Sequence, residues 1–469
     1  MKKLFALCII CTLIFTAGCM QVKVNSSMPY TVENGRIVLK TPERPAGQQS
    51  ALAMTCDPMD TVRVGFVGLG MRGYGAVIRY TYIDGVQITA LCDLLPERTE
   101  ASKNALLERG WPEPALYSGE EGWRELCANP DVDLVYICTP WQNHAEISVY
   151  AMKCGKHVAV EVPGAMSIAE CWDIINTSES TRKHCMMLEN CCYDFFEMTA
   201  LNMAQQGLFG EILHVEGGYI HNIDPYWKLY PNNWRLDYNQ KHRGDNYPTH
   251  GLDPACQVLN IHRGDKMDYL VSMDTKSVHG KEVAKEIMEA EEFASGDHIV
   301  TLIRTAGGRQ IEIQHNVYSR RPYSRIYQIT GSEGFACKYP VQGFALMSHN
   351  LPDGREEYLG LDGVSFVSQE LLEVLLQEYK HPITAEIEEK ALMVGAHGGM
   401  DFIMDYRLIY CLRNGLPLDQ DVYDLAEWSC PVELSRISIE AGSMPVAVPD
   451  FTRGEWDRID GYHHAFSEK

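Results

Sequence analysis

Short apolar runs alternate with amphipathic stretches between residue 61 and about residue 190. The apolar runs predict strands at residues 62–67, 86–92, 134–139, 157–162 and 185–189. The amphipathic stretches predict helices that include residues 97–109, 144–154 and 168–181. Alternation of this kind indicates a doubly wound parallel sheet covered by helices. Ligands of such a sheet bind at the carboxyl ends of its strands, so candidate site residues are expected there.

The pattern changes after residue 190. Longer strand-like runs at residues 212–221, 299–305, 310–318 and 326–331 favour an antiparallel sheet. A helix-like stretch from about residue 386 to residue 413 ends at Asn414-Gly415, a typical helix stop. We therefore predict the α/β class. The expected domains are a parallel-sheet domain over residues 61–190 and an α+β domain with a large open antiparallel sheet over residues 191–469.

The start of the chain lies outside this pattern. Lys2-Lys3 precedes an apolar run, and Thr16-Ala-Gly-Cys19 then places small residues before a cysteine. This arrangement is typical of a secretory signal, here over residues 1–18. It also resembles a bacterial lipoprotein cleavage motif, with Thr16 where Leu is usual.

We therefore expect an exported protein that is held on a bacterial membrane, in the periplasm or at the cell surface, by a lipidated Cys19. Residues 19–60 are polar and predict a tether. The alternatives are a plain signal peptide and a single membrane anchor, but the apolar run is short for a bilayer span.

A glycine-rich turn follows the first predicted strand, in the order Gly68-Leu-Gly70-Met71-Arg72-Gly73. Gly68 permits a tight turn, Gly70 lets the backbone approach a pyrophosphate at a helix N-terminus, and Gly73 allows close packing of that helix. The second strand ends at Asp93, twenty residues beyond Gly73, where a carboxylate can bind ribose hydroxyls. No Arg directly follows Asp93 to bind the extra phosphate of NADP, which Asp93 would repel. The pattern therefore predicts a Rossmann domain that binds NAD rather than NADP. A turn that binds nothing is the alternative.

Composition narrows the class of partner. The 469 residues contain 41 Lys and Arg against 63 Asp and Glu, which gives a net charge of −22. Such an acidic balance argues against nucleic acid, whose phosphates need basic patches. The 16 cysteines form no CxxC motif and no Cys/His spacing of a zinc site. Several of them fall in apolar runs, so we expect buried free thiols and no bound metal.

Two further motifs follow predicted strands, Thr139-Pro-Trp141-Gln142-Asn143-His144 and Glu161-Val162-Pro163. With the glycine loop and His250-Gly-Leu-Asp253, they resemble the Gfo/Idh/MocA superfamily of nicotinamide-dependent sugar oxidoreductases over residues 61–428. Members usually have Lys where this chain has Val162, and often Asp where it has Asn246. Both differences remove groups that commonly transfer protons in sugar dehydrogenases.

A narrower group shares these differences. The chain resembles glycoside hydrolase family 109, which is best known for α-N-acetylgalactosaminidase activity with bound NAD. The motifs that carry this resemblance are Met71-Arg-Gly-Tyr-Gly75, Trp141-Gln-Asn-His144, Glu161-Val162, Tyr247-Pro-Thr-His250, Arg320-Arg-Pro-Tyr-Ser-Arg325 and His397-Gly-Gly-Met-Asp401.

The resemblance implies two sets of site residues. The residues expected to bind NAD are Gly68, Gly70, Met71, Arg72, Gly73, Asp93, Trp141, Gln142, Asn143, His144, Glu161, Val162 and Asn190. The residues expected to bind an amino-sugar glycoside are Tyr219, Arg235, Tyr247, Pro248, Thr249, His250 and Tyr323. His250 is the expected base, and Tyr219 and Tyr323 are the other catalytic candidates. Spacing alone would favour a structural role for His250.

The implied reaction is hydrolysis of terminal N-acetylgalactosamine, α-linked, from glycoconjugates with NAD as a transient redox cofactor. Its steps are oxidation at C3, elimination across C1 and C2, addition of water and reduction at C3. One alternative is an NAD-dependent sugar oxidoreductase with net turnover, and another is a lipid-anchored sugar-binding protein. The broad predicted sheet is compatible with a homo-oligomer.

Overall fold

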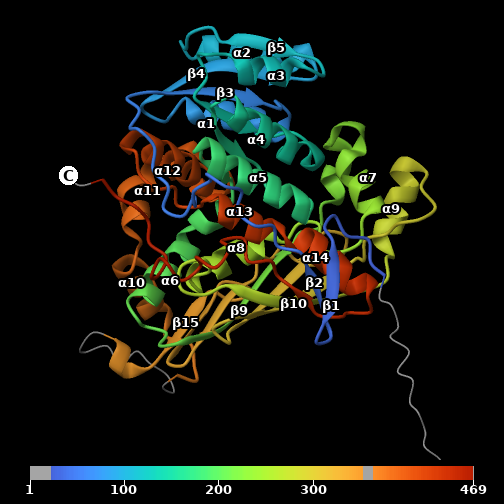
Figure 1. The fold of residues 1–469 in the computed structure, drawn as a ribbon. Coiled ribbons are helices and arrows are strands. Elements are labelled where there is room, and N and C mark those ends of the chain that lie inside the picture. Colours follow the sequence, from blue (N-terminus) through green and yellow to red (C-terminus); the bar gives the residue numbers. More distant parts are fainter. Residues whose placement is uncertain (1–22, 352–362, 468–469) are drawn as a thin grey trace, which may run out of the picture.

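The computed structural model describes residues 23–351 and 363–467 (Figure 1). The predicted signal and the expected lipidation site at Cys19 lie outside the described residues. Within the described ranges, no helix combines the length and the apolar character needed to cross a membrane.

The predicted parallel sheet is confirmed. Its six strands run in the order β5-β4-β3-β6-β7-β8, and every neighbouring pair is parallel. The strands are β3 (Val62–Val67), β4 (Val86–Asp93), β5 (Ala115–Ser118), β6 (Leu134–Ile137), β7 (His157–Val160) and β8 (Cys185–Met187). The connecting helices are α1 (Met71–Tyr80), α2 (Pro96–Glu108), α3 (Gly122–Ala128), α4 (His144–Lys153) and α5 (Ile168–Thr181). Strand β5 was not predicted, because this short edge strand is only partly covered and lacks an apolar run.

The second sheet has ten strands in the described chain, in the order β1-β2-β16-β10-β11-β12-β9-β13-β14-β15. Its central strands are β9 (Ile212–Ile220), β10 (Met267–Asp274), β11 (Ile299–Thr305), β12 (Gln310–Asn316) and β13 (Tyr327–Gly331). Its outer strands are β14 (Gly334–Cys337), β15 (Gly343–Leu346), β16 (Val446–Ala447), β1 (Tyr30–Glu33) and β2 (Arg36–Leu39). Most pairs are antiparallel as expected, but β12 pairs with β9, and β16 with β2, in parallel.

Helices fill the space between the two sheets, as Figure 1 shows for α5, α12 and α13. The remaining helices are α6 (Phe195–Gln205), α7 (Trp234–Lys241), α8 (Thr249–Val258), α9 (His279–Met288), α10 (Gln369–Glu378), α11 (Pro382–Val394), α12 (Met400–Asn414), α13 (Val422–Ser429) and α14 (Pro431–Glu440). Helix α8 packs on β9, while α13 packs on both α5 and β8. The C-terminal half of the chain therefore also builds one wall of the Rossmann domain.

The expected tether over residues 19–60 is wrong for its described part. Strands β1 and β2 extend the large sheet, where Ile37 and Leu39 are fully buried. Further along, Arg44 forms an ion pair with the buried Glu179 on α5, with 3.2 Å between Nε and Oε1. The few apolar residues of this polar segment suffice because several of them, including Ile37, Leu39 and Leu52, enter a core that the rest of the chain provides.

The long helix expected from about residue 386 to residue 413 is also wrong as a single element. It is divided into α11 and α12 by five successive residues with positive φ, from Gly395 to Gly399. Three of the five are glycines, but Ala396 (φ +59°) and His397 (φ +47°) also take this disfavoured conformation. The break places His397 and the start of α12 beside the glycine-rich loop, which an unbroken helix would not allow.

Candidate active site

The glycine-rich loop joins β3 to α1 in the conformation that the pattern predicts. Gly68 has φ of +89°, and a Cβ there would lie 2.7 Å from the backbone of Cys138, which directly follows the neighbouring strand β6. A Cβ on Gly73 would overlap the carbonyl oxygen of Gly68 at 1.8 Å. By contrast, a Cβ on Gly70 would meet only Arg98, at 3.8 Å. Packing within the protein therefore requires glycine at positions 68 and 73. At position 70 the absence of a side chain leaves the backbone accessible to a ligand.

A groove of about 480 Å³ opens at this loop. Gly70 caps α1 without any side-chain hydrogen bond, so the first N–H groups of the helix remain available to a phosphate. The groove is lined by Val67, Gly68, Gly70, Met71, Arg72, Cys92, Asp93, Leu94, Arg98, Gly119, Glu120, Trp123, Cys138, Thr139, Pro140, Asn143, Ile147, Leu229, Tyr230, Pro231, Asn232 and Trp234. Its volume, its bare glycine and its free helix start fit a dinucleotide.

Asp93 lies at the end of β4 in this groove. Its two carboxylate oxygens accept hydrogen bonds from the backbone N–H of Leu69, at 2.6 Å, and of Leu95, at 3.0 Å. Arg98 lies 3.5 Å away and was missed in the sequence, because it follows Asp93 by five residues rather than directly. Asp93 thus fixes the glycine loop in addition to the ribose contact that is predicted for it.

A network centred on the buried Asp401 connects the predicted nicotinamide-side residues. Arg72 donates Nε to Glu161 at 2.6 Å and a terminal nitrogen to Asp401 at 2.6 Å. Asn190 donates to the same Asp401 at 2.5 Å, and His397 Nδ1 lies 2.9 Å from it. Burial alone would raise the pKa of Asp401, but Arg72 and His397 hold that pKa well below its usual range. Asp401 therefore stays ionised and holds three loops together.

The motif at residues 141–144 is divided among different surroundings. Asn143 lines the groove, whereas the exposed Gln142 borders a separate polar hollow. His144 is 1% exposed, and its two ring nitrogens lie 2.7 Å from the Pro163 carbonyl and 2.8 Å from the Thr139 carbonyl. Burial lowers the pKa of His144, while the two carbonyl acceptors act in the opposite direction. With both nitrogens engaged, the ring positions two loops instead of presenting a nitrogen to a ligand. Val162 is also buried, at 5% exposure.

His250 is paired with an acid that the sequence did not single out. Its Nδ1 lies 2.7 and 2.9 Å from the two carboxylate oxygens of Glu189, which is completely buried. Burial alone would raise the pKa of Glu189, but His250 and the Cys191 N–H lower it below its ordinary value. An ionised carboxylate only accepts, so Nδ1 carries the proton and Nε2 is the free acceptor. The Tyr247 hydroxyl lies 3.3 Å from that Nε2.

Aromatic rings lie around His250, among them the predicted substrate residues Tyr219 and Tyr247. The Tyr219 ring contacts the rings of Tyr247 and His250, with centroids 5.2 and 5.0 Å apart. The Tyr219 hydroxyl also lies 2.8 Å from Nδ1 of His221, whose ring meets Tyr323 edge-on at 4.9 Å. Burial raises the pKa of Tyr219 to about 12, so this phenol keeps its proton. Tyr323 is 43% exposed and forms the open side of the cluster.

The other predicted substrate residues lie at different depths. Arg235 on α7 packs over the ring of Tyr247, with 4.9 Å from guanidinium carbon to centroid, and over Trp141, at 5.1 Å. Pro248 and Thr249 are buried at the start of α8, where they set the direction of His250. Asn246 is turned away, since it donates to Asn239 at 3.0 Å and to the His242 carbonyl at 3.1 Å.

Glu189, Asp401 and His221 were given no role in the sequence analysis. Glu189 had a usable signal, because it lies two residues beyond the end of the last strand of the Rossmann sheet, at the edge where ligands bind. Asp401 belongs to a motif that was recognised, but its partners come from residues far apart in the chain. His221 gave no signal.

One group within the described ranges has metal-ligand character. Ligand atoms of Glu189, Cys191 and His250 all lie within 4.8 Å of one another. The Arg325 guanidinium lies 3.1 Å from the Cys191 sulfur, however, and its positive charge opposes a cation there. The geometry therefore favours a hydrogen-bonded acid and histidine pair.

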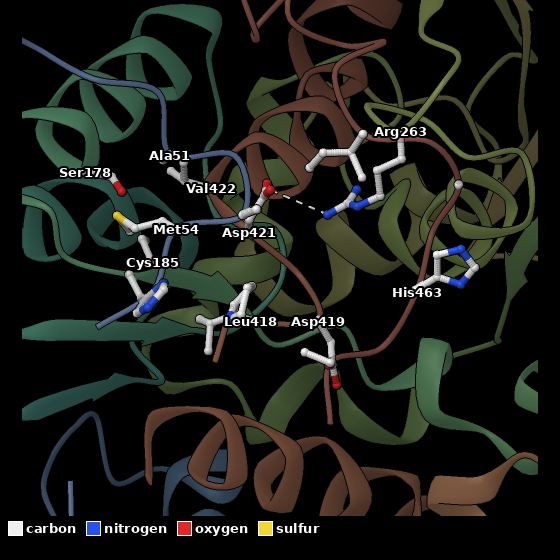
Figure 2. A pocket seen from close by; sticks show the side chains of 16 residues that line it. Ala51, Met54, Ser178, Cys185, Arg263, Leu418, Asp419, Asp421, Val422 and His463 are labelled. Carbon is white, nitrogen blue, oxygen red and sulfur yellow. Dashed lines mark hydrogen bonds and ion pairs between the residues drawn. The ribbon is translucent and has the colours of Figure 1, made fainter. Parts of the chain in front are cut away.

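A second, smaller cavity of about 150 Å³ lies away from these residues. Figure 2 shows Ala51 and Met54 of the N-terminal segment, Ser178 of α5 and His463 near the C-terminus around it. Its one drawn ion pair joins Arg263 to Asp421, at 3.4 Å. This cavity contains none of the predicted site residues.

Comparisons with known proteins decide between the families that this geometry allows. A model of the oxidoreductase family with an NAD-binding Rossmann fold matches residues 62–189, and a model of the glycosyl hydrolase 109 C-terminal domain matches residues 193–458. The chain is 57% identical over 460 residues to glycosyl hydrolase family 109 protein 1 of Phocaeicola vulgatus, which covers 96% of each chain. It belongs to glycoside hydrolase family 109. A Bacteroides thetaiotaomicron protein of the same name is 58% identical over 440 residues, covering 92% of this chain and 93% of that one.

Solved structures confirm the fold of this family 109 protein. Levoglucosan dehydrogenase in complex with NADH and L-sorbose superposes with a TM-score of 0.62 at 19% identity, covering 83% of this chain and all of the other. The WlbA dehydrogenase of Bordetella pertussis in complex with NADH and UDP-GlcNAcA gives 0.60 at 14% identity, covering 83% and 98%. The family 109 chain is thus an NAD-binding, glycoside hydrolase-like enzyme on a Gfo/Idh/MocA fold.

Proposed function

We propose that this family 109 enzyme hydrolyses terminal, α-linked N-acetylgalactosamine from glycoconjugates. The observation that carries the proposal is the Glu189–His250 pair, which lies under a cluster of tyrosines in the same domain as the predicted sugar-binding residues. Two carboxylates flanking the glycosidic bond are the usual glycosidase arrangement, and NAD-dependent enzymes are the exception. A histidine base with a fixed tautomer suits the exceptional route.

The cofactor would bind in the groove at the glycine-rich loop, with Asp93 toward the adenosine ribose and Glu161 and Asn190 on the nicotinamide side. When bound, NAD supplies reversible oxidation and reduction at C3 of the sugar. The network of Arg72 and Asp401 holds Glu161 and Asn190 in place before the ligands arrive. Such preorganisation means that the loops need not rearrange during turnover.

His250 acts as the base in this proposal. Glu189 fixes the proton on Nδ1, so Nε2 accepts a proton from the sugar either directly or through the Tyr247 hydroxyl. The negative charge of Glu189 then stabilises the imidazolium that forms. A ketone at C3 makes the neighbouring C2 proton acidic, which allows the bond between C1 and the leaving oxygen to break by elimination.

The phenols hold the sugar and donate protons. Tyr219, whose pKa is raised to about 12 by burial, remains a hydrogen-bond donor throughout the working pH range. Tyr323 stands on the exposed side, where a leaving aglycone would meet solvent. Position 246 holds the amide Asn246, whose side chain is hydrogen-bonded to Asn239 and His242. This position therefore offers no carboxylate for proton transfer, which supports hydrolysis over net sugar oxidation.

The deciding experiment is hydrolysis of an aryl α-N-acetylgalactosaminide by the NAD-loaded protein in heavy water, followed by NMR of the released sugar. We expect aryl release with deuterium at C2 and no accumulation of NADH. Steady NADH accumulation with free sugar would instead identify a dehydrogenase. Absence of aryl release with this and related sugars would contradict the proposal.

We further propose that the enzyme is exported and that a lipid on Cys19 holds it on a bacterial membrane. The sequence of residues 1–19 supports this proposal. Because the described chain is already packed on the enzyme body from Ser27 onward, through its hydrogen bonds to Glu433 at 2.6 Å, the lipid would hold the enzyme close to the surface.

A further inference from the structure

Arg235 is a buried cation without an anionic partner. It is 7% exposed, and a terminal nitrogen of its guanidinium donates a hydrogen bond to the Tyr230 hydroxyl, at 2.7 Å. Its Nε is buried and has no hydrogen-bond partner. No carboxylate of the described ranges forms an ion pair with it. An unpaired buried charge is costly, so its presence requires an explanation.

The other buried arginines of the same chain show what is missing. Five arginines are buried among the described residues, and each of the remaining four has a carboxylate partner. These pairs are Arg79 with Asp405 at 2.9 Å, Arg263 with Asp424 at 2.7 Å, Arg325 with Asp194 at 2.6 Å and Arg407 with Asp419 at 2.8 Å. Arg235 is also the one of the five among the predicted substrate residues. Its charge is left uncompensated where the sugar would bind.

Aromatic faces stabilise Arg235 in place of a carboxylate. The guanidinium carbon lies 4.9 Å from the Tyr247 ring centroid, 5.1 Å from Trp141 and 5.5 Å from Tyr230. Cation–π contacts hold the side chain by its face, so the N–H groups that Tyr230 does not engage can bind a ligand in the plane of the guanidinium. They do not neutralise the charge, so the positive field remains directed at the site.

We propose that Arg235 is a catalytic residue that stabilises the enolate formed when the C2 proton is removed; this inference rests on the proposed function. That step starts from the sugar ketone at C3, whose oxidation the bound NAD would supply. A base takes the C2 proton, the electron pair of the C2–H bond forms the C2–C3 double bond, and the negative charge moves to the C3 oxygen. When the enolate collapses, the pair returns to form the C1–C2 double bond, and the C1–oxygen bond breaks with its electrons leaving on the aglycone.

A cation without a partner suits this role better than binding of the neutral acetamido group. Preorganised donors are most effective at an atom where charge develops during the reaction, and an acid partner in the protein would cancel that effect. The neighbouring groups agree with a positive field, since burial and then Arg235 lower the pKa of His221. Burial raises the pKa of Tyr219, and the positive charge of Arg235 offsets part of that rise.

The test separates proton removal from the redox step. The NAD-loaded protein is given an aryl N-acetylgalactosaminide already oxidised to the ketone at C3, in heavy water, and NMR follows deuterium at C2 together with aryl release. At saturating ketone, we expect Arg235→Gln to slow deuterium exchange at C2 and aryl release by about 10²–10³-fold, as for loss of an oxyanion donor. Arg235→Lys should recover part of the rate. Lys241→Gln removes a positive charge from the exposed side of the same helix and should match the wild type.

NAD content and circular dichroism of each variant show whether it has folded. If Arg235→Gln exchanges C2 hydrogen at the wild-type rate, or changes only the ketone concentration needed for half-maximal rate, the enolate role is overturned while the glycosidase proposal stands. If folded Arg235→Gln is inactive but Arg235→Lys is no better, positive charge is not what the site uses, and the role is again overturned. If the wild-type protein neither exchanges C2 hydrogen nor releases the aryl group from the ketone, the elimination route itself fails, and the role fails with it.

Discussion

The carboxylate of Glu189 lies 2.7 Å from Nδ1 of His250, although the two residues are 61 positions apart in the chain. One follows the last strand of the Rossmann sheet, and the other is in the first turn of α8. The pair therefore exists only because the two halves of the protein pack together. It sets the tautomer of the histidine and connects the cofactor domain to the proposed sugar site.

We expect Glu189→Gln to lower kcat by about 10²-fold, in line with the usual contribution of a well-placed acid or base. The amide still accepts a hydrogen bond from Nδ1, but it lacks the charge that stabilises the imidazolium. Steady-state kinetics on the aryl glycoside, with NAD content as the control for folding, measures the effect. Glu211→Gln, at an exposed position, should be unchanged. Equal kcat values for Glu189→Gln and wild type would remove Glu189 from the mechanism.

His250→Ala should abolish turnover and leave NAD bound, because the base is lost while the glycine-rich loop is untouched. Aryl release and the cofactor content of the purified variant test both halves of this expectation. Retained activity would show that another group removes the proton.

Gly68→Ala should weaken NAD binding about tenfold or more, since a residue other than glycine with positive φ costs 1–2 kcal/mol and tenfold corresponds to about 1.4 kcal/mol. The new Cβ would also lie 2.7 Å from the Cys138 backbone. Gly75→Ala is the matched control, because its Cβ would meet only Arg79, at 3.7 Å. NAD titration followed by fluorescence or calorimetry compares the two. Equal affinities would contradict the assignment of the loop.

Asp401→Asn should destabilise the protein by about 3–5 kcal/mol, the usual effect of removing one partner of a buried ion pair. Arg72 would keep only Glu161, and Asn190 would lose its acceptor. Denaturant unfolding measures the change. Asp237→Asn, which loses only the exposed pair with Lys241, should change stability by less than about 1 kcal/mol. A small effect at Asp401 would mean that the network does not support the site.

Asp245→Asn should change how stability depends on pH. Burial raises the pKa of Asp245 to about 7, whereas the unfolded chain releases this proton near its ordinary value of 3.8. The wild-type protein therefore loses stability from this group as the pH rises from about 4 to 7, by up to about 4 kcal/mol. The variant should lack this loss. Its Tm minus the wild-type Tm should therefore be larger at about pH 8 than at about pH 5, both near the range where proteins are usually most stable. A constant Tm difference would show that Asp245 ionises normally.

Cys19→Ser should release the enzyme from the membrane fraction if the proposed lipid is its anchor. Radiolabelled palmitate should enter the wild-type protein and not the variant. Aryl hydrolysis per mole of enzyme should be equal in both, because Cys19 lies outside the described enzyme body. Membrane retention of the unlabelled variant would point to an uncleaved apolar segment.

The sequence predicted much of the Rossmann half because each part of it has a local cause. Gly73 is required by contact with the Gly68 carbonyl, Gly68 by its own positive φ, and Asp93 by the end of its own strand. The tether at residues 19–60 was mispredicted for the opposite reason. Ile37 and Leu39 become buried only against strands that lie hundreds of residues later in the chain.

The amino-acid sequence by itself determined the family and the NAD-binding loop, and it supplied the residues of the proposed sugar site, since these depend on short motifs with local geometry. Only the tertiary structure decided which charges meet. It pairs Glu189 with His250 and Asp401 with Arg72, and it leaves Arg235 without an acid. Electrostatic interactions act through space between distant segments, and no local pattern in the chain records which segments will be neighbours.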